Sequence, residues 1–370
     1  SEIRYLGVEL GVNSHKPRQP DDVVAKRFGD CKDKTLLLIA MLEQFGIKAY
    51  PALVSTYGGI NLSDELPSPN LFNHVITRVE FEGSVYWLDP TLSRQFGELE
   101  RLGYYSYDNA LVVGHPSLAL TEMPAAAMTL PTINTFEYIN ILSYDAPVDY
   151  TITTEYTGAE ADYMRSQFGR YGNSAMARKF SNFMVSLYPG LVQTEDLNFS
   201  DQKDINKVTT KEFYRIEGFF EREPNTIVSN LFAYSISSYL TLPTTIKRKT
   251  PLRYIPPIKI VHQTKIRFPE YLNMSLTNAS EGIDSHNFSL DFTEDYRDFS
   301  IITTHKYEAK NSYVSVDDSS SHIKALREAN ELVYRSYLTD YQEQNPSEQV
   351  LSSFINRLNE RMDRLTGDAL

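Results

Sequence analysis

An apolar run near the start of the chain, bracketed by residues that begin and end helices, most constrains the fold. The run Thr35-Leu-Leu-Leu-Ile-Ala-Met-Leu42 is apolar on almost every side of a helix. This pattern is typical of a helix inside a core rather than on a surface. Asp30 is a favoured residue just before a helix, and Gly46 just after one. The sequence therefore predicts a core helix from Cys31 to Gln44.

The residues around this helix predict the other elements of a small domain. In chain order we expect a short helix over 21–28 that ends at Gly29, a strand over 47–56, a loop over 58–70, and strands His74–Phe81 and Val85–Pro90 joined at Glu82-Gly83.

Length predicts two domains, with three as the alternative, and the expected elements predict an α+β protein. The chain has 370 residues, more than one ordinary core accommodates. Periodicity is lost over 117–135, so we place a boundary there, with one domain over 1–122 and a β-rich domain over 123–370. In the second domain we expect paired strands over 136–156, a helical region over 159–187, short strands over 195–306, and C-terminal helices over 317–365, divided into 317–341 and 347–365.

Charge and hydropathy exclude two classes of protein. The formal net charge is −12, whereas a nucleic-acid binder needs a basic footprint. No apolar run reaches the length of about 18 residues that a membrane-spanning helix needs. The chain begins Ser-Glu-Ile-Arg, with neither an initiating Met nor a signal-peptide pattern. We interpret this start as that of a processed product or of a piece of a longer protein.

Cys31 is the only cysteine, so no intramolecular disulfide can form, and its role is core packing, metal binding or nucleophilic attack. A metal site is not expected, because there is no second thiol and no His pair at ligand spacing. A thiol becomes a better nucleophile when a helix N-terminus or an imidazolium favours its thiolate. Cys31 is expected at such a helix start, where free N–H groups can also bind an oxyanion. The Asp30 carboxylate opposes the thiolate.

The parity of the predicted hairpin decides whether His74 and Asp89 can meet. Side chains alternate between the two faces of a strand. With a two- or four-residue turn, Glu80 pairs with Val85 and His74 becomes a diagonal neighbour of Asp89 on the same face, within side-chain reach. A three-residue turn would separate them. A carboxylate beside an imidazole orients it and stabilises its cation, as in a catalytic triad.

Several motifs together resemble the transglutaminase-like superfamily of papain-like cysteine acyltransferases and proteases. They are Tyr5-Leu-Gly-Val-Glu-Leu-Gly11, His15-Lys-Pro-Arg-Gln-Pro20, Arg27-Phe-Gly-Asp-Cys-Lys-Asp-Lys34, Leu42-Glu-Gln-Phe-Gly-Ile-Lys-Ala-Tyr-Pro51, Asn73-His-Val75 and Trp87-Leu-Asp-Pro-Thr91. Gly-Asp-Cys-Lys-Asp-Lys is similar to a bacterial subgroup in which this domain lies between two β-rich domains. The resemblance covers residues 1 to about 120. Relatives usually carry a small residue and Trp after the His, where this chain has Val-Ile-Thr.

The resemblance implies a papain-like core with Cys31 as nucleophile, His74 as base and then acid, and Asp89 as its orienting group. It implies acyl transfer on a protein or peptide substrate through a thioester, with water or an amine as acceptor and no cofactor. It further implies an upstream β-rich domain outside this chain and an extracytoplasmic (periplasmic or secreted) location. The alternative is a non-catalytic protein-interaction module with the same fold.

Other candidate residues have plainer interpretations. His15 can line the cleft, although a surface or loop-fixing role is favoured. Asp33 is too near Cys31 to orient His74, so we expect it to be solvated on the helix surface. The other histidines have no carboxylate pattern around them in the sequence and are expected to be structural, at positions 115, 262, 286, 305 and 322.

Overall fold

The computed structural model describes most of the chain, which folds into two compact units. The first unit comprises residues 1–130 with 204–206, and the second 131–203 with 207–370. The division falls inside the region 117–135 that loses periodicity, and the assignment of domains to 1–122 and 123–370 stays a prediction. No helix among the described residues is long and apolar enough to cross a membrane. The described residues are 2–7, 15–57, 59, 62–99, 102, 107–117, 119–123, 131–223, 226–245, 248–253, 258–270, 278–297, 299–311 and 313–340.

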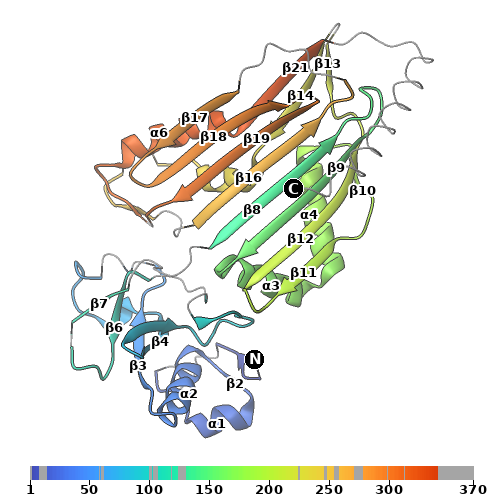
Figure 1. Ribbon diagram of the computed structural model, residues 1–370. Helices are drawn as coiled ribbons and strands as arrows, with labels where there is room; N and C mark the ends of the chain where they lie inside the picture. Colours follow the sequence, from blue (N-terminus) through green and yellow to red (C-terminus); the bar gives the residue numbers. More distant parts are fainter. Residues whose placement is uncertain are drawn as a thin grey trace. The chain divides into compact units, whose positions relative to one another are not determined.

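The first unit is built on a five-stranded antiparallel sheet in the order β5-β4-β3-β6-β7 (Figure 1). Helix α2 packs against its strands β3 and β4, and a two-stranded parallel pair, β1-β2, precedes α2. The elements are β1 (Arg4–Tyr5), α1 (Pro20–Lys26), β2 (Phe28–Gly29), α2 (Cys31–Glu43), β3 (Lys48–Val54), a 3-10 turn (Pro69–Leu71), β4 (His74–Phe81), β5 (Ser84–Leu88), β6 (Asn109–Val112) and β7 (Thr121–Glu122).

The second unit is built on a nine-stranded sheet whose described strands pair antiparallel, except for the parallel pair β8 and β16. Its path runs β10-β12-β9-β8-β16-β19-β18-β17, with β11 added on β12. The strands are β8 (Thr132–Asn140), β9 (Val148–Thr157), β10 (Leu191–Gln193), β11 (Asn198–Gln202), β12 (Lys207–Ile216), β16 (Ile258–Arg267), β17 (Ala279–Asp284), β18 (Phe288–Arg297) and β19 (Ser300–Ala309).

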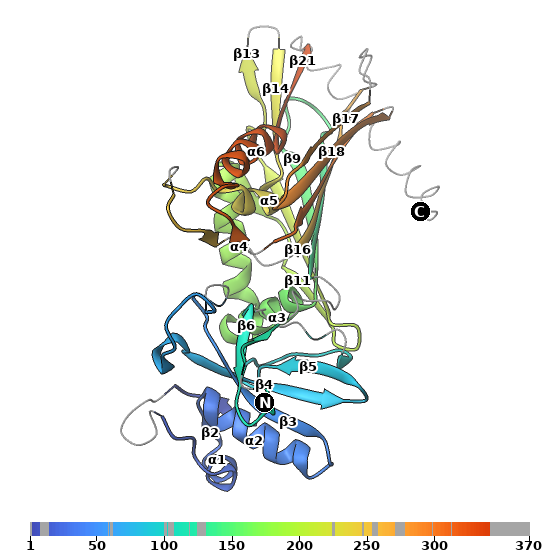
Figure 2. The ribbon, with the colours of Figure 1, turned by 90° about the vertical axis from the view of Figure 1, so that its left-hand side faces the viewer.

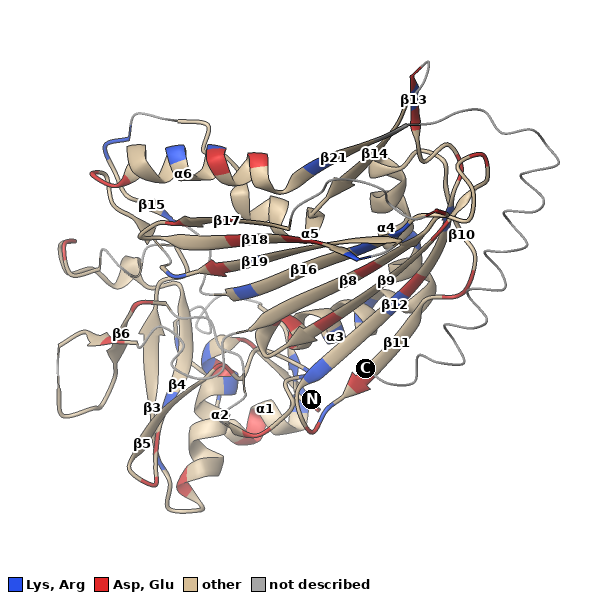
Figure 3. Cartoon of the chain, turned by 45° about the horizontal axis from the view of Figure 1, so that its top comes forward, with Lys and Arg blue, Asp and Glu red and all other residues tan. Residues whose placement is uncertain are grey.

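Helices and two smaller sheets complete the second unit. Figure 2 shows α4, α5 and α6 on one side of the large sheet. Figure 3 shows acidic and basic positions spread over several strands of this sheet. These elements are α3 (Ala159–Tyr171), α4 (Asn173–Leu187), α5 (Tyr234–Ser237), a 3-10 turn (Ser238–Leu240), α6 (Ser319–Leu332), the sheet β13 (Glu221–Glu223), β14 (Thr226–Phe232) and β21 (Tyr334–Asp340), and the pair β15 (Leu252–Arg253) and β20 (Tyr313–Val314).

The α+β prediction is confirmed, with two corrections to the helices of the second unit. The helical region 159–187 is two helices, because Gly172 takes a φ of 78° that few other residues adopt. The helix predicted over 317–341 is wrong beyond Leu332. The following residues form β21, whose backbone pairs with β14 along seven positions, and this pairing overrides the weak helical pattern. The helix predicted over 347–365 lies outside the described residues.

A buried polar network crosses the inner face of the large sheet. Glu137 on β8 accepts hydrogen bonds from Thr264 Oγ1 (2.6 Å) and Tyr150 OH, and its Oε2 lies 3.0 Å from His262 Nε2. His262 Nδ1 in turn lies 2.8 Å from Ser235 Oγ on α5. Burial favours the neutral acid, but the charge of His262 and these hydrogen bonds hold the pKa of Glu137 below its usual value. The network therefore ties β8, β9, β16 and α5 together through one buried carboxylate.

Removal of this carboxylate is expected to destabilise the second unit. Glu137→Ala leaves His262 and two hydroxyls without their buried acceptor, and breaking a buried pair costs about 3–5 kcal/mol. The midpoint of urea unfolding, monitored by hydrogen exchange of the backbone amides in β8 and β16, measures the loss of stability. Asp284→Ala is the matched control, because it removes an exposed ion pair with Lys310 and leaves the midpoint nearly unchanged. Equal midpoints for the two variants would contradict the role of the network.

Candidate functional site

Helix α2 begins at Cys31 because two aspartates cap each other across its first turn. Asp30 Oδ1 accepts from the backbone N–H of Asp33 (3.1 Å), and Asp33 Oδ2 accepts from the N–H of Asp30 (3.2 Å). Such a reciprocal capping box satisfies two N–H groups that the helix itself cannot pair. The predicted helix start and its Asp30 cap are confirmed, and the helix ends at Glu43 just before Gly46, whose φ is 72°.

Two expectations about this helix are wrong. Asp33 is not solvated on the surface: it is fully buried, and Arg18 contacts it. The helix is not enclosed by a core either, because its far end is open to solvent, with Met41 56% and Phe45 80% exposed. Only one side of α2 packs against the sheet. On that side Ile39 forms a small apolar cluster with Ala49 and Val79.

The hairpin β4–β5 has the register that brings His74 and Asp89 together. Glu80 pairs with Val85 as predicted. The two-residue turn Glu82-Gly83 has φ values of 50° and 79°, the pattern of a type I′ turn. His74 Nε2 lies 2.8 Å from Asp89 Oδ2. The alternation of side chains thus places both groups on one face.

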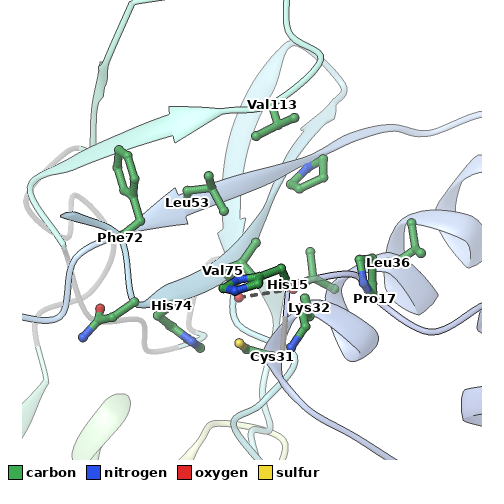
Figure 4. A pocket seen from close by; sticks show the side chains of 13 residues that line it. His15, Pro17, Cys31, Lys32, Leu36, Leu53, Phe72, His74, Val75 and Val113 are labelled. Carbon is green, nitrogen blue, oxygen red and sulfur yellow. Dashed lines mark hydrogen bonds between the residues drawn. The ribbon is translucent and has the colours of Figure 1, made fainter. Parts of the chain in front are cut away.

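The opposite side of the His74 imidazole faces the cysteine. The Cys31 thiol lies close enough to the ring to raise the pKa of His74, and Figure 4 shows the imidazole directed toward the sulfur. Nε2 is bonded to Asp89, so Nδ1 is the nitrogen left for the thiol. The structure therefore brings Cys31, His74 and Asp89 together in the order that acid–base chemistry through an imidazole requires.

Two residues that were not singled out from the sequence support the pair. Asp89 Oδ1 accepts from both the backbone N–H (2.9 Å) and the hydroxyl (2.6 Å) of Thr91. Tyr107 packs edge-on against His74, with ring centroids 5.9 Å apart. Trp87 is buried in the apolar cluster of the sheet instead. The motif Asp-Pro-Thr could have pointed to Thr91, because this residue follows Asp89 closely in the sequence. No pattern around Tyr107 in the sequence indicates its contact with His74.

The charged state of the His–Asp pair follows from these contacts. Burial disfavours the imidazolium, but the hydrogen bond and charge of Asp89, with those of Cys31, raise the pKa of His74 to about 9. Burial likewise opposes the Asp89 carboxylate, yet His74 and Thr91 hold the pKa of Asp89 below its usual value. The arrangement therefore favours an imidazolium beside a carboxylate at neutral pH.

A cavity of about 590 Å³ opens beside Cys31 and His74. Its apolar wall consists of Pro51 and Leu53 on β3, Phe72 and Val113 (Figure 4). His15 also lines it, and the same residue is exposed, as its favoured surface role predicts. Cys31 is 8% exposed, and the exposed part adjoins this cavity.

Two of the histidines with no carboxylate pattern around them in the sequence lie next to carboxylates in the fold. His262 contacts Glu137 as described above, and His115 lies 3.6 Å from Glu80. Glu137 is 125 residues from His262 in the sequence, and Glu80 lies on β4, far before His115. No local sequence pattern therefore predicts either contact. His262 is fully buried and ties elements of the sheet together, which accords with the structural role expected for it.

No protein-family model matches the chain, and no curated protein matches its sequence. Among solved structures, one from Parabacteroides distasonis ATCC 8503, described as "a putative protease", is similar with a TM-score of 0.48 and 11% identity. The likeness covers 92% of this chain and 49% of that one, so the chain spans about half the length of that protein. This likeness does not identify a family.

The titration of His74 tests this electrostatic arrangement. We expect an NMR titration midpoint of about 9, and a fall toward the ordinary value of about 6.5 in Asp89→Asn. Because the folded value lies above the unfolded one, the stabilisation is complete below about pH 6.5 and is lost as the pH rises through about 9. A wild-type midpoint near 6.5 would contradict the arrangement.

Proposed function

We propose that this chain is a cysteine acyl-transfer enzyme that acts on peptide or amide bonds through a thioester on Cys31. One observation carries the proposal: a single imidazole, His74, lies between the only thiol and a buried carboxylate, beside an open cavity. The residue order and motifs that resemble transglutaminase-like proteins support the same assignment. A non-catalytic module would have no need of this juxtaposition next to a cavity.

The proposed reaction has two steps that the same three side chains serve. The Cys31 thiolate attacks the carbonyl carbon, a C–S bond forms, and the C–N bond breaks as the His74 imidazolium protonates the departing amine. Water or an amine then attacks the thioester carbon and gives its proton to His74. The C–S bond breaks, the acyl product leaves, and the Cys31 thiolate and the His74 imidazolium are restored. Asp89 keeps the imidazole oriented throughout. N–H groups in the first turn of α2, which have no intrahelical partner, are suited to the oxyanion.

The apolar wall indicates which substrate residues the site favours. An apolar cavity gains free energy from burying an apolar side chain and loses it when a charged one is desolvated. The described lining contains Pro51, Leu53, Phe72 and Val113 on this wall, and its one lysine, Lys32, is already paired with Asp30. We therefore expect a bulky apolar residue next to the attacked carbonyl.

Cys31 alkylation tests the nucleophile. A free thiol is only about 0.3% ionised at pH 6, so a thiolate held by an imidazolium should react with iodoacetamide at least about tenfold faster than a model thiol there. His74→Ala should remove this advantage. His115→Ala is the matched control, because this half-buried histidine contacts Glu80 outside the triad. If wild-type Cys31 is alkylated at the same rate as the model thiol between pH 5 and 8, the proposal is contradicted.

Substrate preference is tested with paired peptide amides that differ in one residue, Leu or Asp, beside the cleaved bond. The wild-type protein should favour Leu in kcat/KM by at least about tenfold. Leu53→Asp should narrow that ratio, because it places a charge in the apolar wall. Leu66→Asp changes an 87% exposed leucine away from the cavity and should leave the ratio as it is. A wild-type preference for Asp would overturn the assignment of this wall.

A further inference from the structure

Two buried carboxylates lie beside the proposed nucleophile, where uncompensated charge would oppose a thiolate. Asp30 and Asp33 flank Cys31 in the first turn of α2, and both are fully buried. Like charges close together raise the cost of ionising either group. Because a buried carboxylate is screened by little water, its repulsion is stronger than at a surface. A thiolate at Cys31 therefore depends on cations that neutralise these two groups.

Each carboxylate has its own cation in the structure. Lys32 Nζ pairs with Asp30 Oδ2. Arg18 binds Asp33 twice, through its guanidinium to Oδ2 and through its backbone N–H to Oδ1 at 2.7 Å. The side chains of Lys32 and Arg18 are only 15% and 12% exposed. With both pairs formed, the negative charges of Asp30 and Asp33 are compensated. The N-terminal end of the helix dipole can then favour an anion at Cys31.

Arg18 also connects this helix start to the wall of the cavity. It belongs to the segment 15–19 that precedes α1, and two other residues of this segment, His15 and Pro17, line the cavity beside Cys31. The guanidinium additionally lies over the ring of Phe28, 5.7 Å from its centroid. The double contact with Asp33 thus holds the segment against the first turn of α2.

The backbone beneath the contact leaves little room for change. A Cβ on Gly29 would lie 2.7 Å from the Cβ of Asp33 and 3.2 Å from Val23. The Asp33 side chain therefore packs directly against the backbone of Gly29 in β2, two residues before Cys31. The position of the Asp33 carboxylate is therefore defined by backbone as well as by its hydrogen bonds.

We propose that Arg18 is a positioning residue for the acyl-transfer site: it neutralises Asp33 so that Cys31 can exist as a thiolate, and it holds the His15–Pro17 wall in place. This inference rests on the proposed function and adds to it a residue that touches neither the thiol nor the imidazole in the described contacts. The charged and titratable groups around Cys31 are Asp30, Lys32, Asp33 and Lys34 on α2, and His15, Arg18, His74 and Asp89 on other elements.

The test compares the pH profile of Cys31 alkylation in the full chain across a set of variants. In Arg18→Gln the Asp33 charge is uncompensated, so the profile should move to higher pH and the rate at about pH 6 should fall roughly tenfold. Arg18→Lys keeps the charge but loses the planar guanidinium over Phe28, so its profile should lie between those of the wild type and Arg18→Gln. The double variant Arg18→Gln with Asp33→Asn removes both charges and should recover most of the rate. Such recovery would not follow from a purely structural role.

The control is Arg27→Gln, because Arg27 pairs with Glu2 on the exposed surface and should leave the profile unchanged. If Arg18→Gln alkylates as the wild type does, or if the double variant is no faster than Arg18→Gln, the inference is overturned while the proposed function stands. The same holds if Arg18→Lys behaves as Arg18→Gln, since charge would then be irrelevant. If wild-type Cys31 itself reacts no faster than a model thiol, the proposed function fails and the inference fails with it.

Discussion

The capping of Asp30 and Asp33 on each other is the interaction on which the arrangement of the first unit depends. It sets the first residue of α2 at Cys31, and a helix that started one residue earlier or later would rotate the thiol by about 100° around the axis. From this start, α2 packs across β3 and β4, and Thr35 donates to the carbonyl of Val75 next to His74. The thiol and the imidazole are therefore positioned by the same few contacts.

The elements that carry the proposed triad could be predicted because each has a short-range signal. A capping residue and an apolar run mark the helix, and the turn Glu82-Gly83 sets the hairpin parity that brings His74 to Asp89. The surroundings have no such signal. Arg18 reaches Asp33 across 15 positions, and Glu137 reaches His262 across 125. Contacts of this kind depend on tertiary packing, which one sequence read by local patterns does not contain.

The same distinction explains where secondary structure was wrongly predicted. Residues 334–340 continue a weak amphipathic pattern from α6, yet β14 offers a strand edge with which their backbone pairs. The exposed end of α2 is a second case: an apolar composition predicted full burial, but Met41 and Phe45 face solvent. Apolar composition specifies that a segment can be buried, whereas the neighbouring elements decide which of its sides are covered.

The central claim, that Cys31 carries an acyl group during turnover, is tested most directly by trapping that intermediate. The full chain would be mixed with an apolar p-nitrophenyl ester of a short peptide, quenched in acid within seconds, and mapped by mass spectrometry. We predict an adduct of the acyl mass on the peptide that contains Cys31, accumulation of that adduct when the acceptor step is slow, and its loss in His74→Ala. Release of nitrophenol with no acyl group on Cys31, or an equal yield in His74→Ala, would contradict the claim.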